Sequence, residues 1–501
     1  MTTMTIDTDK INQTYRHHYH LMPESGWMND PNGFSFFNNE YHLFYQHYPY
    51  DTMWGPMHWA HAVSPDLIRW THKEIALKPD KAYDRNGVFS GSGLQVGSEH
   101  WLYYTGHIDS NLDFLYDENF KKRPEAAILA SESHIRQVQC LAKSEDGVKY
   151  TKYEGNPVIG TDRVPAGIKV EDFRDPKVWI HANKFFMAVG AKSTENIGHV
   201  LFYVSSDGID WEYLNLLTLG KNFGTVWECP DLFELDGKHV LLFSPQEKPR
   251  VGNDFENIHS SMALIGSFDY STGEFTVEGE QEIDQGFDFY APQSTLTADG
   301  KRVMIAWMNM WDMRYPLHEL GHGWNGSMTL PRELSLKNGR LIQRPHHAIE
   351  NYQEQKVELS DFAISGHYGN DSLNGDSQRI DIQFDMEDSS YFSIDFFKGK
   401  NEKFALTFYK DRNQMVLDRK ESVYVIENLA CKNDYSRSQS IDLSGSIKLS
   451  IFLDVSSIEI FVNDGELVFT SLFFSEEMGD CVSFYSKGRT HVNKLLKWMI
   501  S

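Results

Sequence analysis

Three short motifs combine a carboxylate with a proline and with aromatic or basic neighbours, and their side chains could carry out acid–base or nucleophilic chemistry. They are WMNDPNG (residues 27–33), EDFRDP (171–176) and WECPD (227–231), with candidate acids Asp30, Asp175 and Glu228. Two carboxylates can act as nucleophile and general acid when their surroundings separate their pKa values. Desolvation and a neighbouring carboxylate would raise the pKa of Glu228, as a general acid at neutral pH requires.

Each motif also has a purely structural interpretation. Asp30-Pro31-Asn32-Gly33 is a turn sequence, because turns favour Asp, Pro, Asn and Gly. An arginine beside an aspartate, as in Arg174-Asp175, is usually a solvated surface pair, although inside a site the cation would help keep Asp175 ionised. The three motifs each precede a different predicted group of strands, and this joint occurrence favours one shared site.

A repeated element runs through the first 350 residues. Turn residues followed by a mostly apolar, aromatic-rich run occur at 38–47, 97–106, 182–191, 236–245 and 299–308. Such runs are typical of hairpins that lead into buried strands. A second pattern, Ser-x-Asp followed by an aromatic residue, occurs after the first four copies, at 64–70, 144–150, 205–211 and 267–275.

Five copies at blade-sized spacing predict a five-bladed β-propeller over residues 15–350. The fifth copy lacks the second pattern, and we expect strands from both ends of this segment to close the ring. Propellers place ligand sites at the axis, where the inner strands of all blades converge. The three acidic motifs are therefore expected to meet there.

The chain changes character after about residue 345. A polar stretch rich in Gly, Ser, Asn and Asp leads into strands with period-two alternation, such as 379–386 and 446–454. Alternation of this kind means that one face of a sheet is buried. Residues 357–501 are predicted to form a C-terminal antiparallel β-sandwich, so the fold class is all-β. Sugar binding, contact with the propeller and dimerisation all stay open as its role.

Composition excludes several classes of function. The formal net charge is −24, which disfavours binding to nucleic acid or to an anionic membrane. The four cysteines are far apart, so no zinc motif is present. No apolar signal segment and no run of about 18 apolar residues is found. The simplest expectation is a cytoplasmic protein without a membrane or nucleic-acid partner.

The motifs WMNDPNG, FRDP and WECPD, in this order on a five-bladed frame, resemble glycoside hydrolase family 32, the β-fructofuranosidases. Further matching stretches lie at 44–46, 54–59, 89–92, 286–293 and 330–334. The resemblance covers residues 15–350 and, more loosely, 357–501. Ala60 and Asn309 depart from it, because glycine is expected at both positions.

The resemblance implies a retaining hydrolysis in two displacements, with carboxyls about 5–5.5 Å apart. Asp30 would be the nucleophile, Glu228 the acid/base, and Asp175 the group that holds the fructosyl hydroxyls and stabilises the transition state. Hydrogen bonds to the fructosyl ring are implied for Asn29, Gln46, Ser90 and Arg174. Apolar walls are implied for Trp27, Trp54, Phe89 and Trp307. Cys229 would be part of the surroundings of Glu228, and neither a metal nor an organic cofactor is implied.

The implied substrate is a small-molecule fructoside, with sucrose 6-phosphate preferred and sucrose also accepted; the stretch 315–334 carries this preference. The alternatives are hydrolysis of sucrose or short fructooligosaccharides without a phosphate preference, fructosyl transfer, and non-catalytic sugar binding. A phosphorylated sugar needs local cations on so acidic a protein, and Arg314, His318 and His322 are candidates. Homo-oligomerisation stays open.

Overall fold

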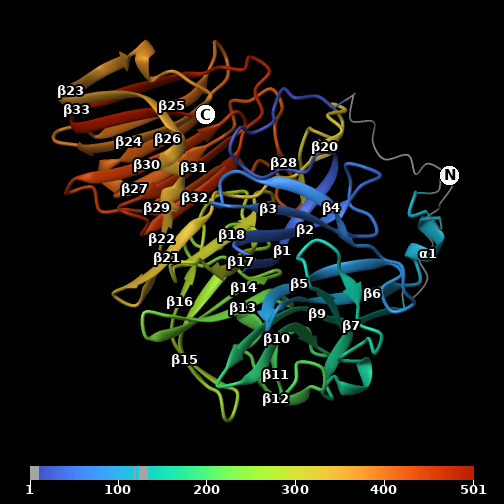
Figure 1. The fold of residues 1–501 in the computed structure, drawn as a ribbon. Helices are drawn as coiled ribbons and strands as arrows, with labels where there is room; N and C mark the ends of the chain where they lie inside the picture. Colours follow the sequence, from blue (N-terminus) through green and yellow to red (C-terminus); the bar gives the residue numbers. More distant parts are fainter. Residues whose placement is uncertain (1–10, 118, 123–133) are drawn as a thin grey trace.

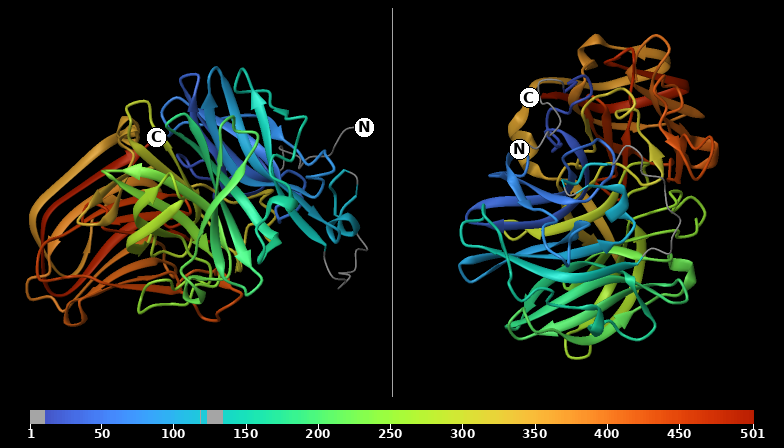
Figure 2. Two further views of the ribbon diagram at one scale, coloured as in Figure 1. Left: turned by 90° about the horizontal axis from the view of Figure 1, so that it is seen from below. Right: turned by 90° about the vertical axis from the view of Figure 1, so that its right-hand side faces the viewer.

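The computed structural model describes residues 11–117, 119–122 and 134–501, and it is built almost entirely of β-strands (Figure 1). Five sheets form a propeller and the C-terminal strands form a β-sandwich, which confirms the predicted fold class. Figure 2 shows the two parts packed side by side, with the sandwich against one flank of the propeller. Among the described residues, no helix is both long and apolar enough to cross a membrane.

The blades are antiparallel sheets in chain order. Blade I contains β1 (Gly26–Phe37), β2 (Glu40–Tyr48), β3 (His58–Ser64) and β4 (Thr71–Leu77). Blade II contains β5 (Gly87–Val96), β6 (Glu99–Asp109), β7 (Ile135–Ser144) and β8 (Thr151–Lys152). Blade III contains β9 (Ile168–His181), β10 (Lys184–Ser193), β11 (Gly198–Ser205) and β12 (Glu212–Leu217). Blade IV contains β13 (Trp227–Leu235), β14 (Lys238–Pro245), β15 (Met262–Asp269) and β16 (Glu274–Glu282). Blade V contains β17 (Tyr290–Leu296), β18 (Arg302–Trp307), β21 (Arg332–Lys337) and β22 (Arg340–Pro345).

The helices are short. They are α1 (Leu112–Leu115) and the 3-10 turns at Thr161–Arg163, Lys221–Phe223, His347–Tyr352, Asp371–Leu373 and Lys410–Arg412.

Each of the two sequence repeats corresponds to one kind of structural element. The five apolar runs form the second strand of each blade, β2, β6, β10, β14 and β18. The four Ser-x-Asp patterns form the turns between third and fourth strands. In the first of these turns, Asp66 Oδ1 accepts hydrogen bonds from the N–H groups of Ile68 and Arg69, and Asp146 and Asp207 repeat this arrangement. The aspartates are there because they satisfy the backbone donors of tight turns.

The ring closes at blade I and not at blade V. The two-residue strand β20 (Trp324–Asn325) pairs in parallel with Gly26 and Trp27 at the start of β1. Segments from both ends of the propeller therefore meet, as expected. The fifth blade nevertheless contains no N-terminal strand. Its third and fourth strands are β21 and β22, and a long connection separates β18 from β21.

The sandwich depends on two long strands. β23 (Gln353–Gly369) and β33 (Cys481–Ile500) pair with each other along most of their length. The second half of β33 also pairs with β24 (Ser377–Asp385), which leads to β30 (Ile447–Asp454), β31 (Ser457–Val462) and β32 (Leu467–Leu472). The first half pairs with β25 (Tyr391–Lys398), which leads to β26 (Phe404–Tyr409), β27 (Gln414–Asp418) and β29 (Ser436–Ser440). β33 thus contributes to both layers (Figure 1).

Buried charges join the N-terminal segment, the propeller and the sandwich. Arg332 in β21 lies 2.9 Å from Asp284 and 2.7 Å from Glu459 of β31. Glu459 also pairs with His20, whose other ring nitrogen lies 2.7 Å from Asp454. These side chains have no solvent exposure. A chain of alternating charges of this kind holds the parts together only while each member keeps its partner.

We expect stability to fall as the pH rises toward about 9, because His20 is held protonated. Burial lowers the pKa of His20, but its bonds to Asp454 and Glu459 outweigh this and raise the pKa to about 9. The unfolded value is about 6.5, so the stabilisation is complete below that pH and is lost as the pH rises through the folded value. His20→Gln should lose about 3 kcal/mol or more and this part of the pH dependence.

Thermal melts across this pH range would measure both effects. His367→Gln, at an exposed position of β23, is the matched control and should behave as the wild type. Equal pH dependence in the wild type and His20→Gln would contradict the assignment.

Candidate active site

The innermost strand of every blade carries a β-bulge at the same height. The pairing register shifts at Met28–Pro31, Phe89–Gly91, Arg174–Lys177, Glu228–Asp231 and Tyr290–Gln293. In four of the five the bulge contains a proline, which lacks the N–H that a regular ladder uses. Bulges redirect side chains next to functional sites. The sequence-based interpretation of 30–33 as a turn ahead of the strands was therefore wrong, because the motif lies inside β1.

This common bulge explains how three acids distant in sequence converge. Asp30 and Asp175 each stand directly before the bulge proline, in blades I and III, and Cys229 has that position in blade IV. Glu228 stands one residue earlier, at the position that Arg174 occupies in blade III. Asp175 and Cys229 take positive φ angles of 68° and 48°. The same backbone irregularity therefore presents different side chains to the axis.

Asp30 and Asp175 share Cys229 as a neighbour. The Cys229 Sγ atom lies 3.7 Å from Asp30 Oδ2 and 3.6 Å from Asp175 Oδ2. The N–H of Cys229 donates to Asp175 Oδ2 at 3.0 Å, and Ser90 Oγ donates to Asp30 Oδ2 at 2.8 Å. The other oxygen of Asp30 is enclosed and has no hydrogen-bond partner in the protein. One carboxylate oxygen of Asp30 is thus held in place while the other is unengaged.

Glu228 is held by a guanidinium and a phenol. Arg174 approaches Glu228 Oε1 with Nε at 3.1 Å and Nη2 at 2.8 Å, and Tyr290 donates to Oε2 at 2.6 Å. Arg174 also reaches Asp172 at 3.0 Å. The side chain of Glu228 is 13 % exposed, so this end of the cluster opens toward solvent. Both oxygens of the carboxylate are fixed in direction.

The protein holds more carboxylates here than cations, and their pKa values respond. Burial, and then the charge of Glu228, raise the pKa of Asp30 to about 6. Burial raises the pKa of Asp175 against the opposing charge of Arg174, and the charges of Glu228 and Asp30 add to the rise. Burial would also raise the pKa of Glu228, but Arg174 and the Tyr290 hydroxyl outweigh it and hold this pKa below its usual value.

One electrostatic expectation from the sequence was therefore wrong. Glu228 does not have the raised pKa expected of it, because Arg174 directs its guanidinium at this carboxylate. Arg174 also lowers the pKa of Asp175, as expected, although burial outweighs it there. The physical reason is the bulge register, which places Arg174 and Glu228 at equivalent heights on adjacent blades.

The remaining predicted side chains are joined to one another by hydrogen bonds and ring contacts. Trp27 donates from its indole to Asn29 Oδ1 at 2.7 Å, and Trp27 packs edge-on against Trp307 at 5.8 Å between ring centroids. Gln46 donates to the carbonyl of Val88, next to Phe89 and Ser90. Trp54 packs edge-on against Phe89 at 6.2 Å. These aromatic rings belong to one apolar cluster with Cys229 and Tyr290.

The axis is closed by polar contacts one step beyond the bulges. Lys177 lies 3.0 Å from Asp231, and the Gln293 amide donates to the carbonyl of Gly91 at 2.8 Å. Asn32 accepts from the N–H of Gly91 at 3.2 Å. These side chains follow the bulge prolines by one residue in their strands and are buried, so they close the axis on one side of the acids.

Sequence reasoning missed Tyr290 and Trp311. Tyr290 lies in the stretch 286–293 that carried the family resemblance, so its position was noticed but its contact with Glu228 was not. Trp311 extends the aromatic wall, with ring centroids 4.9 Å from Trp307 and 6.1 Å from Trp27. No motif surrounds Trp311 that would have identified it.

The three basic residues suggested for phosphate do not form a free cationic cluster. Arg314 pairs with Glu427 at 3.4 Å and Glu319 at 3.7 Å. His318 contacts Thr52 at 2.6 Å and lies 3.6 Å from Asp51. His322 is buried and stacks on Tyr15 at 5.1 Å. Each of the three side chains therefore already has a partner within the protein, and phosphate binding by them stays a prediction.

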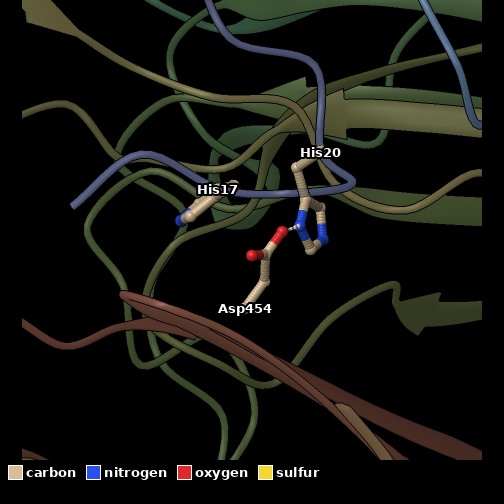
Figure 3. Close-up of side chains that lie close together, drawn as sticks. All are labelled: His17, His20 and Asp454. Atoms are coloured by element: carbon tan, nitrogen blue, oxygen red, sulfur yellow. Dashed lines mark hydrogen bonds and ion pairs between the residues drawn. The ribbon is translucent and has the colours of Figure 1, made fainter. Parts of the chain in front are cut away.

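Two groups of possible metal ligands occur among the described residues, and neither includes the three acids. In the first, formed by His17, His20 and Asp454, Figure 3 shows His20 directed at Asp454. The other ring nitrogen of His20 pairs with Glu459, so the ring is an imidazolium between two carboxylates. In the second, formed by Glu333, His346 and His347, the ammonium of Lys301 lies 3.0 Å from Glu333. In the first group the carboxylates are paired with protonated His20, and in the second the carboxylate is paired with Lys301. A metal ion would have to displace these partners.

Family profiles account for nearly the whole chain. Residues 20–345 match the glycosyl hydrolases family 32 N-terminal domain, and residues 343–498 match the family 32 C-terminal domain. The chain belongs to glycosyl hydrolase family 32. The resemblance noted from its motifs is thereby confirmed.

Individual members of family 32 are similar over almost their full length. A sucrose-6-phosphate hydrolase of Escherichia coli is 38% identical over 95% of this chain and 93% of its own. A raffinose invertase of Escherichia coli is 37% identical over 93% of this chain and 91% of its own. The solved Bombyx mori GH32 beta-fructofuranosidase BmSUC1 superposes with a TM-score of 0.81 at 33% identity, covering 98% of this chain and 95% of its own. A sucrose-6-phosphate hydrolase structure from Lactobacillus gasseri superposes with a TM-score of 0.84 at 28% identity, covering 99% and 95%.

Removing the Tyr290 hydroxyl should raise the pKa of Glu228. The hydrogen bond at 2.6 Å favours the ionised carboxylate, and Tyr290→Phe removes that bond while it keeps the ring. The pH dependence of kcat/KM reports ionisations of the free enzyme, so the limb assigned to Glu228 should move to higher pH. Tyr41→Phe, outside the site in β2, should leave the profile unchanged. A limb that stays in place or moves to lower pH in Tyr290→Phe would contradict this assignment.

Proposed function

We propose that this family 32 enzyme hydrolyses the β-fructofuranosidic bond of sucrose 6-phosphate and of sucrose, releasing fructose and glucose 6-phosphate or glucose. The observation that carries the proposal is the convergence of Asp30, Asp175 and Glu228 at the bulges of three blades, beside one cluster of aromatic side chains. We assign residues 15–350 to the catalytic domain and 357–501 to the sandwich. The similar proteins named above support the choice of substrate.

Asp30 is the nucleophile in this proposal. Ser90 fixes one of its oxygens, and the other, which has no protein partner, attacks the anomeric carbon in the proposed reaction. Glu228, at the more open end of the cluster, protonates the leaving oxygen and then activates water. Asp175 is held by the N–H of Cys229 and accepts hydrogen bonds from fructosyl hydroxyls. Two displacements of this kind give retention of configuration.

The low pKa of Glu228 in the free site is compatible with its role as an acid. Arg174 is the main group that holds this pKa down, and the family resemblance assigns Arg174 to the fructosyl ring. A sugar hydroxyl that accepts from the guanidinium competes with Glu228 for it. Binding of the substrate would weaken the pair and exclude water, and both changes raise the pKa of Glu228. The proton would therefore move onto Glu228 when the bond to be cleaved is in place.

Asp30→Asn and Glu228→Gln should each lower kcat by about 10³-fold or more, while the fold is kept. With methanol as acceptor, the wild type should form the β-anomer of methyl fructofuranoside, which is the product of retention. The matched control is Asp299→Asn, at an exposed turn of blade V, which should keep the turnover of the wild type. Near-normal turnover in either acid variant would reject the role given to that acid.

A specific observation favours the second candidate, an invertase or short fructooligosaccharide hydrolase without a phosphate preference. Arg314 and His318 already have carboxylate or hydroxyl partners. A phosphate bound beside them would have to compete with Asp51 and Glu427 for the same side chains.

Preference for sucrose 6-phosphate would also support a cytoplasmic location, because a charged sugar phosphate does not cross a bilayer unaided.

The ratio of kcat/KM for sucrose 6-phosphate to kcat/KM for sucrose separates these candidates. A phosphate preference predicts a ratio well above one that falls as salt is added, because charge attraction is screened. Arg314→Gln should lower the ratio if this side chain contacts the phosphate, and Lys337→Gln, an exposed cation of blade V, is the control. A ratio of one would leave the invertase as the function.

A further inference from the structure

The aromatic cluster beside the acids includes one more ring than the side chains assigned to the fructosyl ring, that of Trp311. Trp307 is fully buried and Trp27 is 8% exposed, whereas Trp311 is only partly buried. Trp311 lies nearly parallel to Trp27, with 29° between the ring planes, and contacts Trp307 at 4.9 Å. Of these three contacting rings, that of Trp311 is therefore the one nearest to solvent.

The segment that follows Trp311 is connected to Glu228 through two side chains. Tyr290, which donates to Glu228, packs edge-on against His259 at 6.3 Å. His259 Nε2 lies 3.0 Å from Asp312 Oδ2, and Asp312 follows Trp311 directly. If Glu228 protonates the leaving oxygen, the leaving group must lie on this outward side of Glu228. Trp311 packs against the same apolar cluster as Tyr290, the donor to Glu228.

The sandwich holds this segment in place. The backbone N–H of Leu429 donates to the carbonyl of Asp312 at 2.7 Å. The next two residues, Met313 and Arg314, form β19 (Met313–Arg314), which pairs with β28 (Glu427–Asn428) of the C-terminal domain. On the propeller side, the N–H of Met310 donates to the hydroxyl of Tyr315 at 2.8 Å. Both residues that flank Trp311 are thus held by hydrogen bonds.

We propose that Trp311 is the platform against which the leaving glucosyl unit packs, and that the sandwich domain positions it through β28 and Leu429. This rests on the proposed function. The faces of a pyranose ring carry C–H groups, which pack well against the negative face of an indole. The sandwich would then act on substrate selection without itself contacting sugar.

Comparison of two fructosides tests the platform. In Trp311→Ala, kcat/KM for sucrose should fall by about 10-fold or more, as expected for a lost apolar contact, mainly through KM. For methyl β-D-fructofuranoside, whose leaving group is too small to reach the ring, kcat/KM should be unchanged. Trp311→Phe should restore most of the loss, and Trp498→Ala, on the sandwich strand β33, is the control. Equal losses for both fructosides, or no loss for sucrose, would overturn the proposal.

Binding measurements separate this proposal from the proposed function. In an Asp30→Asn background, which prevents turnover, calorimetry should show weaker binding of sucrose when Trp311 is replaced by Ala, and unchanged binding of fructose. Unchanged sucrose binding would overturn the platform whatever the catalytic activity. Failure of the wild type to cleave either fructoside would instead overturn the proposed function.

The role of the sandwich has its own matched pair of variants. Leu429→Pro removes the N–H that holds Asp312, whereas Leu429→Ala keeps it; the leucine side chain is 61% exposed. Leu429→Pro should reproduce the sucrose-selective loss, and Leu429→Ala should not. Circular dichroism and the melting temperature would establish that both variants are folded. A folded Leu429→Pro variant with wild-type selectivity would reject positioning by the sandwich.

Discussion

One guanidinium among four carboxylates is the constraint on which this site depends. Arg174 binds Glu228 at 2.8 Å and Asp172 at 3.0 Å, and Asp30 and Asp175 both contact Cys229. Taking that many charges out of water is costly unless each has donors. The hydroxyls of Ser90 and Tyr290 and the N–H of Cys229 supply them. Because the carboxylates outnumber the cations, the protonation of the cluster depends on the ligand that binds beside it.

The propeller meets this constraint with a backbone feature instead of with loops. Every innermost strand leaves its regular pairing at the same height, and four of them do so at a proline. A bulge on a strand that is paired along its length is more rigid than a loop, so the acids keep their separation. The outer strands can then vary without disturbing the axis.

The sequence was most informative where the signal is local. Ser-x-Asp turns and aromatic runs repeat along the chain, because each blade needs the same kind of turn and the same kind of buried strand. These repeats predicted the five blades. Contacts between residues far apart gave no such signal. Closure by the two-residue strand β20, the pairing of Arg174 with Glu228 and the position of Trp311 depend on which blades become neighbours. The pKa of Glu228 was misjudged for the same reason, since its cationic partner lies 54 positions away.

The two-layer strand β33 links the register of one layer of the sandwich to that of the other. It is the partner of β23, β24 and β25, which pair with different parts of its twenty residues. A shift of β33 by one residue would exchange its two faces, because successive side chains of a strand point to opposite sides of the sheet. Since the same strand belongs to both layers, such a slip would disrupt both at once, and neither layer can change its register alone.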